Sequence, residues 1–382
     1  MAMQILIDAY IPYIQGIVEQ LPFSQGVKVS YLSPEEFTPQ AVRKADALLI
    51  RTRTRCDAAL LHGSQVRFIA TATVGFDHLD TAYLDERGIS WTNAPGCNAN
   101  SVAEYVEAAL YLLDDRKSQL PARTLGVIGV GHVGGRVARQ AEKTGYRVLR
   151  CDPPRMANSL CVADPSHTVS EGGAIAEEVT IETFVSLQEV IEQADIITFH
   201  VPLTREGTHP TYHLADEAFF AAVKRAGRAP IIINTARGEV VDNAALLHAL
   251  EEGVVSEAIL DVWESEPRLN TNLLDRTFLG TPHIAGYSAD GKANATRMVV
   301  EALCCFYQLP IMPQFIAPPS PDNVSTFPSF GSRAEQLLHA YNPLRDSTIL
   351  KANSADFEQF RTNYPLRREL NAYFALSLTR SL

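Results

Sequence analysis

Three short segments in the second half of the chain place charged or titratable side chains at the ends of apolar runs. They are residues 234–238 (NTARG), 261–267 (DVWESEP) and 281–287 (TPHIAGY). Together they offer the guanidinium of Arg237, a carboxylate and the imidazole of His283. A guanidinium can hold a carboxylate substrate through paired hydrogen bonds, while an imidazole made more basic by a carboxylate can take a hydroxyl proton. Either residue alone would more often be structural, so we interpret them as a set.

A glycine-rich turn upstream of these segments has the form of a dinucleotide-binding site. Gly129, Gly131 and Gly134 follow a predicted strand and open a predicted helix, and Asp152 ends the next strand. Glycines here allow a tight turn and the close approach of a pyrophosphate to the helix N-terminus, while the aspartate can accept hydrogen bonds from ribose hydroxyls. The alternative, a plain strand-to-helix turn, is less favoured because Asp152 is in place.

The acidic side chain of Asp152 favours NAD over NADP. Its charge would repel the 2′-phosphate of NADP, although Arg150 and Arg155 nearby could offset that repulsion. With NAD bound, a hydride would leave the substrate for nicotinamide as the imidazole takes the hydroxyl proton. The residues therefore predict a 2-hydroxyacid oxidoreductase that uses NAD and no metal.

Strands of a parallel α/β fold would position these side chains. Apolar runs at residues 4–7, 27–31, 47–50 and 68–71 alternate with helix-compatible stretches, which is typical of βαβ units. A second α/β unit opens at Thr124, with predicted strands at 125–129, 147–151, 195–199, 230–234 and 257–261. Arg237, Asp261 and His283 then fall at the carboxyl ends of strands, where open α/β sheets bind ligands.

Helices and loops complete this prediction. Residues 101–113 predict a helix with a serine start that bridges two domains, and residues 289–307 predict another helix. Residues 153–180 are rich in Pro, Ser, Gly and acidic residues and indicate a long surface loop. Proline-rich segments after residue 308 predict a linker into a final segment of mixed composition.

Composition narrows the class of protein. A chain of 382 residues exceeds the size of one core, so two or three domains are expected. The net charge of -11 argues against nucleic-acid binding, so local arginines must hold any anionic substrate. Six cysteines without metal-site spacing are typical of reduced thiols. Without a basic leader or a membrane-length apolar run, we expect a cytoplasmic protein with no membrane partner.

A local positive site could form after the apolar run at residues 47–50. Arg51, Arg53 and Arg55 alternate along the chain, and alternate residues of an extended segment share a face. Up to three guanidiniums could then bind a phosphate through bidentate hydrogen bonds. A solvated charged turn is an alternative of equal weight.

The glycine turn and the three segments after it are similar, in this order, to those of D-2-hydroxyacid dehydrogenases acting on NAD. The resemblance implies that Arg237 binds the substrate carboxylate, that His283 is the acid/base and that Glu266 is its partner. It also implies an α/β fold in which a Rossmann-type NAD domain is inserted into a flavodoxin-like substrate domain, with the active site in the cleft. A small C-terminal α+β dimerisation domain would follow. The expected bounds are 1–97 and 288–310 for the substrate domain, 98–287 for the NAD domain and 311–382 for the dimerisation domain.

Further segments are similar to one branch of that family, which oxidises 4-phospho-D-erythronate at C2 to (R)-3-hydroxy-2-oxo-4-phosphooxybutanoate in vitamin B6 synthesis. They are residues 93–99, 151–155, 260–267 and 283–287, with a weaker match at 361–369 that implies a homodimer. We assign cofactor contacts to Gly129, Gly131, His132, Val133, Gly134, Asp152, Thr235, Ala236, Arg237, Asp261 and Gly286. We assign substrate contacts to Thr52, Thr73 and Tyr287 from the resemblance, and to Arg51 from its place after an apolar run.

Two other functions stay open at this point. The acid could be phosphoglycerate, glycerate or glyoxylate, although the GCNA segment at 96–99 and the long tail argue against these. A regulator that senses NAD without catalysis could share the fold and would show negligible turnover. The complete set of Arg237, Glu266 and His283 favours catalysis.

Overall fold

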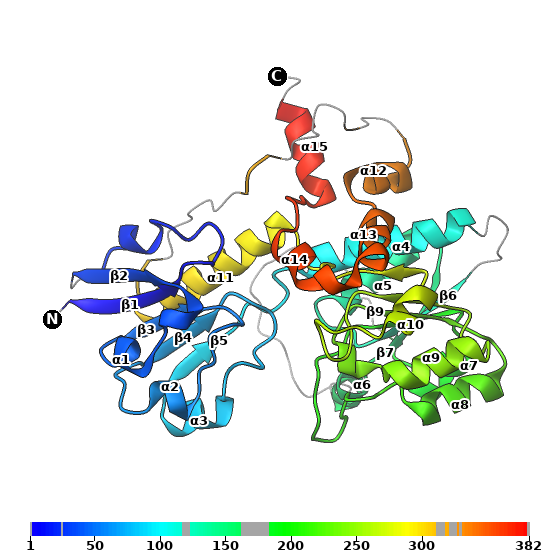
Figure 1. Ribbon diagram of the computed structural model, residues 1–382, viewed down its shortest axis with the longest axis horizontal. Helices are drawn as coiled ribbons and strands as arrows, with labels where there is room; N and C mark the ends of the chain where they lie inside the picture. The colour runs from blue at the N-terminus through cyan, green and yellow to red at the C-terminus, as the bar shows by residue number, and fades with distance from the viewer. Residues whose placement is uncertain are drawn as a thin grey trace. The chain divides into compact units, whose positions relative to one another are not determined.

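The computed structural model describes residues 2–23, 26–116, 123–161, 183–310, 318–320, 327 and 331–379. Two parallel sheets organise the chain into two units (Figure 1). Unit 1 comprises Met1–Ser101, Gly286–Phe327 and Leu366–Leu382, and unit 2 comprises Val102–Ala285 and Pro328–Pro365.

Unit 1 holds a five-stranded parallel sheet in the order β2-β1-β3-β4-β5, which is the order of flavodoxin-like folds. Its strands are β1 (Met3–Asp8), β2 (Val27–Leu32), β3 (Ala47–Ile50), β4 (Phe68–Thr71) and β5 (Ser90–Thr92). Its helices are α1 (Pro39–Val42), α2 (Ala58–Leu61), α3 (Thr81–Glu86), α11 (Ala289–Phe306) and α15 (Leu370–Thr379).

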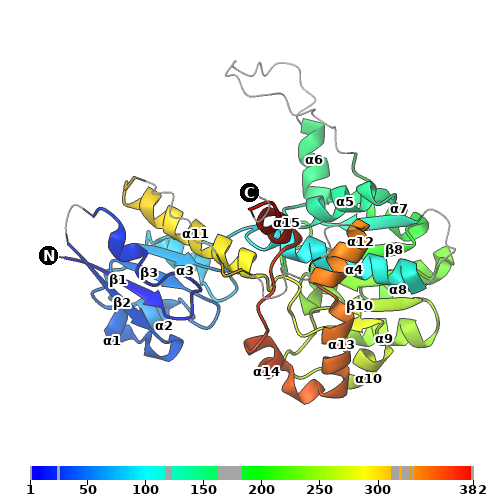
Figure 2. The ribbon, with the colours of Figure 1, turned by 90° about the horizontal axis from the view of Figure 1, so that it is seen from above.

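Both faces of the unit 1 sheet are covered. Successive strand residues point to opposite faces, so Ile5 and Ile7 of β1 join the core that includes α11, whereas Leu6 joins the core that includes α1 and α2. Figure 2 shows α11 alongside this sheet. Burial on both faces explains why β3 and β4 are continuous apolar runs.

Unit 2 holds a six-stranded parallel sheet in the order β11-β10-β9-β8-β6-β7. The strands are β6 (Thr124–Ile128), β7 (Arg147–Cys151), β8 (Ile196–Phe199), β9 (Ile231–Asn234), β10 (Glu257–Leu260) and β11 (Leu279–Gly280). The chain order reverses at β6, between β7 and β8, which is the switch point where doubly wound sheets bind ligands. The sheet of unit 2 is therefore of the Rossmann type.

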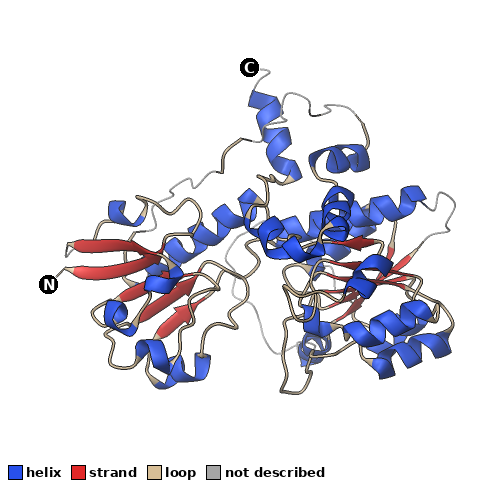
Figure 3. Cartoon of the chain, viewed as in Figure 1, coloured by secondary structure: helices blue, strands red, loops and turns tan. Residues whose placement is uncertain are grey.

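Helices flank the unit 2 sheet (Figure 3). They are α4 (Ala99–Arg116), whose first turn belongs to unit 1, α5 (Gly134–Lys143), α6 (Pro153–Cys161), α7 (Leu187–Gln193), α8 (Glu217–Ala226), α9 (Asn243–Glu251), α10 (Thr271–Arg276), α12 (Arg333–Ala340), α13 (Pro343–Ala352) and α14 (Phe357–Thr362). The boundary between the units falls inside α4, after Ser101. The expectation that this helix belongs to both domains agrees with that boundary.

The predicted strands are all present, with ends that differ by at most one residue. The predicted serine start of the helix at 101 is wrong, because α4 begins at Ala99 and Ser101 is fully buried inside it. The short strands β5 and β11 were not predicted, since runs of two or three residues carry too little periodicity.

The predicted loop at 153–180 is wrong at its start, because residues 153–161 form α6. Proline is tolerated in the first helical turn, where its missing N–H would have no intrahelical partner. Asp152 accepts a hydrogen bond from the backbone N–H of Arg155 at 3.1 Å, as a helix cap does. Residues 162–180 of the predicted loop lie outside the described residues.

The C-terminal segment differs from the expected third domain. Its described elements after residue 330 are all helices, where α+β structure was expected. Leu350 and Phe357 are fully buried in the core of unit 2, and the Ser347 hydroxyl accepts from the Gly280 N–H of β11 at 3.0 Å. Further along, the Arg367 carbonyl accepts from the Ala289 N–H at 2.7 Å in unit 1. These apolar and polar contacts divide the segment between the two units.

Candidate active site

The turn after β6 needs glycine at two of its motif positions. Gly129 has a φ of +84°, and a Cβ there would lie 2.7 Å from the carbonyl oxygen of His200. A Cβ at Gly134 would lie 1.9 Å from the Gly129 carbonyl oxygen. Gly131 differs, because among the described residues a Cβ there would meet no atom within 4 Å. The open space beside Gly131 suits the approach of a pyrophosphate to the N-terminus of α5.

A cavity of about 540 Å³ adjoins this turn within unit 2. Gly129, Gly131 and Asp152 line one part of it, and residues 200–202, 204 and 208–211 line another. Asp152 accepts a hydrogen bond from the Val130 N–H at 2.8 Å, so its carboxylate braces the turn while it lines the cavity. A ribose hydroxyl is expected at this place in a Rossmann-type site. The residues present therefore fit a dinucleotide.

His200 lines the same cavity and was not among the predicted site residues. Its Nε2 lies 2.9 Å from the Thr198 hydroxyl. Burial lowers the pKa of His200 to about 3. The imidazole is therefore neutral at pH 7 and contributes hydrogen-bonding capacity without charge.

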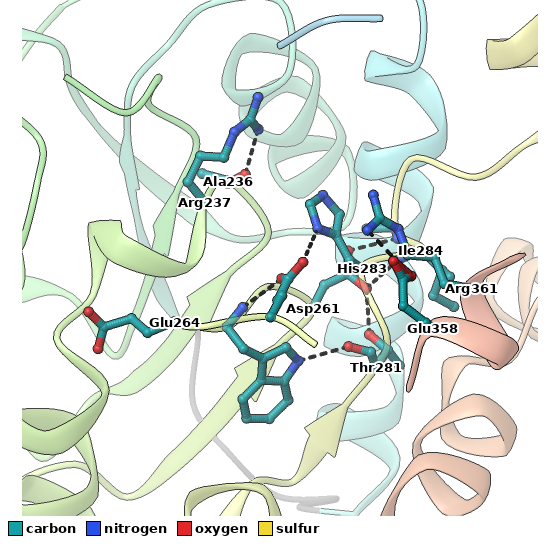
Figure 4. A network of polar contacts seen from close by, with 12 residues as sticks. Ala236, Arg237, Asp261, Glu264, Thr281, His283, Ile284, Glu358 and Arg361 are labelled. Carbon is teal, nitrogen blue, oxygen red and sulfur yellow. Dashed lines mark hydrogen bonds and ion pairs between the residues drawn. The ribbon is translucent and has the colours of Figure 1, made fainter. Parts of the chain in front are cut away.

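The turn that carries Arg237 is held by the buried side chain of Asn234 at the end of β9. The Asn234 amide accepts from the Ala236 N–H at 3.0 Å and donates to the Arg237 carbonyl at 2.8 Å. A Cβ at Gly238 would lie 2.0 Å from the Trp263 carbonyl oxygen, so glycine lets this turn pack against the 261–267 segment. The Arg237 Nη1 donates to the Ala236 carbonyl at 2.8 Å (Figure 4). The backbone of Arg237 is thus fixed while its side chain stays half-buried.

Asp261 holds the loop that carries His283. One carboxylate oxygen accepts from the Thr281 hydroxyl at 2.7 Å and from the Ile284 N–H at 2.8 Å, and the other accepts from the Ala285 N–H at 2.8 Å. The residue is almost completely buried. Asp261 therefore positions the loop, and its predicted contact with the cofactor stays a prediction.

His283 and Glu266 form a histidine–carboxylate pair, as the sequence predicts. The His283 Nδ1 lies 2.8 Å from one Glu266 oxygen, and the other oxygen accepts from the Trp263 N–H at 2.9 Å. The backbone of His283 has a φ of +58°, and its N–H donates to the Asp261 carbonyl at 2.7 Å, which holds this uncommon conformation in place. Because Nδ1 is engaged with the carboxylate, Nε2 is the nitrogen left to accept a substrate proton.

The surroundings keep Glu266 ionised. Burial raises the pKa of this carboxyl, but the hydrogen bond and charge of His283, the Trp263 N–H and the charge of Arg361 together outweigh burial and hold the pKa below its ordinary value. Arg361 comes from α14, where it lies 4.0 Å from Glu358 (Figure 4). The C-terminal segment therefore contributes to the electrostatics of the Glu266–His283 pair, which no motif in the sequence indicated.

A second histidine–carboxylate pair lies in the same unit. The His213 Nε2 is 2.7 Å from a Glu264 oxygen, and the second Glu264 oxygen accepts from the Asn243 N–H at 2.8 Å. Both glutamates of the ESEP sequence thus have a histidine partner, and only Glu266 faces His283. The geometry agrees with the expected pairing of Glu266.

Predicted substrate residues of unit 1 follow its strands. The Thr73 hydroxyl lies just after β4, 2.7 Å from the Thr71 hydroxyl, and donates to the Gly75 carbonyl at 2.9 Å. Thr52 is exposed after β3. Gly286 has no room for a side chain, because a Cβ there would lie 2.1 Å from the Asn98 amide nitrogen. The ligand contacts of Thr52, Thr73 and Gly286 stay predictions.

Of the two alternatives for Arg51, Arg53 and Arg55, the structure favours a charged turn over a cluster of three guanidiniums. Residues 52–54 follow β3 as a turn, so alternate side chains do not share a face. Arg55 pairs with Asp57 at 2.8 Å, and Arg53 is exposed. Arg51 alone of the three is partly buried, and its Nη1 donates to the Tyr10 carbonyl at 2.9 Å.

Comparison with known proteins identifies the family. Residues 102–285 match the model for the NAD binding domain of D-isomer specific 2-hydroxyacid dehydrogenases. The chain is 49% identical to a Bacteroides fragilis relative over 97% of this chain and 98% of the relative, and 40% identical to one from Porphyromonas gingivalis over 99% and 96%. The chain belongs to the family of D-isomer specific 2-hydroxyacid dehydrogenases, and it is an NAD-dependent dehydrogenase.

Both relatives carry the same name, erythronate-4-phosphate dehydrogenase. A solved structure with a similar fold is D-lactate dehydrogenase from Aquifex aeolicus, complexed with NAD and lactic acid. Its TM-score is 0.59 at 24% identity, over 81% of this chain and 100% of that chain. Among the described residues, no helix is both long and apolar enough to span a membrane.

Proposed function

We propose that the protein oxidises 4-phospho-D-erythronate at C2 to (R)-3-hydroxy-2-oxo-4-phosphooxybutanoate, with NAD as cofactor, in vitamin B6 synthesis. The name of the relatives supports the substrate. The observation that carries the chemistry is the 2.8 Å contact between the His283 Nδ1 and Glu266, which leaves Nε2 for the substrate.

In this proposal Arg237 binds the C1 carboxylate through two parallel hydrogen bonds and so orients the C2 hydroxyl. The His283 Nε2 takes the hydroxyl proton as the C2–H bond breaks, and the ionised Glu266 stabilises the imidazolium that forms. NAD, when bound, supplies the acceptor for the hydride that leaves C2. The backbone N–H of Trp263 donates to the other Glu266 oxygen at 2.9 Å and so keeps the carboxylate aligned with the imidazole ring. Proton and hydride thus leave together and yield the 2-oxo acid.

The experiment is a turnover panel that follows NADH absorbance with 4-phosphoerythronate, erythronate, 3-phosphoglycerate and glycerate. We expect the highest kcat/KM for 4-phosphoerythronate. His283→Ala, assayed in parallel, excludes background activity from a contaminant. A higher kcat/KM for another acid would overturn the proposed substrate assignment. Absence of turnover with every acid would favour an NAD-sensing regulator.

A parallel arm replaces NAD with NADP in the same assay. Asp152 lines the cavity with a carboxylate that would repel a 2′-phosphate, so NAD should be preferred. The backbone N–H of Arg155 donates to Asp152 at 3.1 Å, so the arginine that could offset this repulsion is adjacent to the carboxylate. Equal kcat/KM with the two cofactors would contradict the assigned role of Asp152.

We also propose a cytoplasmic homodimer with C-terminal residues at its interface. Leu344 and Ile349 of α13 are large apolar side chains that are 41% and 49% exposed, which is typical of interface positions. The described cysteines are free thiols, consistent with a reducing compartment. Light scattering should give twice the chain mass of 41.9 kDa, and the double substitution L344E/I349E should reduce it to one chain. A monomeric wild-type protein would contradict the dimer, and a dimeric double variant would exclude this interface.

A further inference from the structure

Two cations from distant parts of the sequence lie in the same region of unit 1. The carbonyl of Tyr10 accepts from Arg51, and two residues later the carbonyl of Pro12 accepts from the Thr296 hydroxyl at 2.6 Å, one turn after Lys292 in the same helix. Arg51 follows the last residue of β3, and Lys292 lies in the first turn of α11. The Arg51 Nη1 is fixed by its hydrogen bond to the Tyr10 carbonyl at 2.9 Å, and the Lys292 ammonium lies 4.9 Å from the centre of the Tyr287 ring. Tyr287 is one of the predicted substrate residues, so both cations belong to the part of unit 1 where a substrate is expected.

Neither cation has a carboxylate partner within ion-pair distance in the described part of the chain. Other cations of unit 1 do have one, such as Arg55 with Asp57 at 2.8 Å and Arg368 with Asp290 at 2.9 Å. The Nε atom of Arg51 is buried and has no hydrogen-bond acceptor among the described residues. The pair is therefore not explained by a structural ion pair.

The electrostatics of Lys292 also indicate a cation without a carboxylate partner. Burial lowers the pKa of the Lys292 ammonium, and the positive charge of Arg51 lowers it further. The charged group that acts on Lys292 is therefore another cation. A cation in the first turn of a helix also opposes the helix dipole, which favours anions there. The buried carboxylate of Asp8 lies within electrostatic reach of Arg51 and Arg53 and partly balances them, but it does not act on Lys292. An anion at this place would interact favourably with both cations and with the N-terminus of α11.

We propose that Lys292 and Arg51 together bind the phosphate group of the substrate. A phosphate monoester carries close to two negative charges at neutral pH, which match two cations, whereas a carboxylate carries one. The inference deepens the proposed function and rests on it for the identity of the acid. Lys292 was absent from the predicted site residues because its sequence neighbours, GKANA, carry no phosphate-binding motif.

The alternative is that Lys292 only packs on Tyr287 as a structural cation–π contact. In that case its replacement would weaken the enzyme equally for phosphorylated and unphosphorylated acids. The two possibilities therefore differ in substrate dependence and can be separated by kinetics.

The test compares wild type, Lys292→Met and Lys292→Arg on 4-phosphoerythronate and erythronate. Lys292→Met should lower kcat/KM for the phosphorylated acid by about 10- to 100-fold, the usual effect of losing a charge-assisted contact, and change kcat/KM for erythronate by less than about threefold. Lys292→Arg keeps the charge and should recover most of the activity. Lys44→Met, at an exposed lysine of the same unit, is the matched control and should behave as wild type. An equal proportional loss on both acids would overturn the proposal.

A second arm does not depend on the identity of the acid. Inorganic phosphate should bind the wild-type protein in calorimetry, and its dissociation constant should rise about tenfold or more in Lys292→Met. If the wild type fails to oxidise 4-phosphoerythronate but keeps this difference, the proposed function is wrong and the anion site stands. If turnover occurs and phosphate affinity is the same in both proteins, the anion site is wrong and the proposed function stands. Circular dichroism of both variants shows whether they are folded.

Discussion

Glu266 receives one hydrogen bond from the backbone and one from an imidazole, and both favour its ionised form. Because its folded-state pKa lies below the unfolded value, this pairing stabilises the fold above the unfolded pKa. The stabilisation is lost as pH falls through the folded pKa. Acidification should therefore weaken the alignment of His283 before it unfolds the protein.

His283→Ala should lower kcat by roughly 10²- to 10⁴-fold, which is the usual contribution of a general base. Glu266→Gln keeps the shape of the partner but removes its charge, so it should lower kcat and change the acid limb of the pH–rate profile. The measurement is initial rate from pH 5 to 10 for wild type and both variants. Glu264→Gln, in the second histidine pair, is the matched control and should keep the wild-type profile. An unchanged profile in Glu266→Gln would argue against the pairing.

Arg237 is held by a turn that a substitution of its side chain leaves intact, because Asn234 bonds to backbone atoms. Arg237→Lys keeps a positive charge but loses the paired donors, so kcat/KM should fall by about one to two orders of magnitude. NADH affinity, measured by fluorescence, should change little. Near-native kcat/KM in this variant would refute carboxylate binding by Arg237.

At the scale of elements, the glycine turn contains one glycine that the fold requires and another that leaves room for the cofactor. A Cβ at Gly134 would overlap the Gly129 carbonyl oxygen, whereas the space beside Gly131 is open among the described residues. The same chemical change at the two positions should therefore have different consequences.

Gly134→Ala should destabilise the protein by about 1–3 kcal/mol or more, because its methyl group would overlap a backbone oxygen. Gly131→Ala should leave the unfolding midpoint close to wild type and weaken NAD binding. Urea unfolding and NADH titration measure the two effects. If Gly131→Ala bound NADH as tightly as wild type, the pyrophosphate would not approach at this position.

At the scale of the whole molecule, the C-terminal segment is part of the core of unit 2. Phe357 is fully buried in that core, and Arg361 one turn later acts on Glu266. The segment therefore links folding of unit 2 to the electrostatics of the Glu266–His283 pair, in addition to the proposed role at a dimer interface.

Phe357→Ala should destabilise the protein by about 3–5 kcal/mol, because it leaves a cavity in a closed core. Phe76→Ala removes the same side chain from a position that is 44% exposed and should cost less than about 1 kcal/mol. Urea unfolding followed by circular dichroism compares the two. An unfolding midpoint that is the same for wild type and Phe357→Ala would show that the segment folds apart from unit 2.

The sequence alone predicted the strands, the glycine turn and the pairing of Glu266 with His283, all of which the structure shows. Those features are local, since apolar periodicity and residue spacing define a parallel strand and the turn that follows it. The catalytic roles of Arg237, Glu266 and His283 stay predictions. The sequence could not exclude the cluster of Arg51, Arg53 and Arg55, because a turn of three residues decides which side chains share a face. It also could not show that Glu264 pairs with His213, that the charge of Arg361 acts on Glu266 or that the charge of Arg51 acts on Lys292. Each of these contacts joins residues far apart in the chain, so packing of whole elements decides them, and no local pattern records that packing.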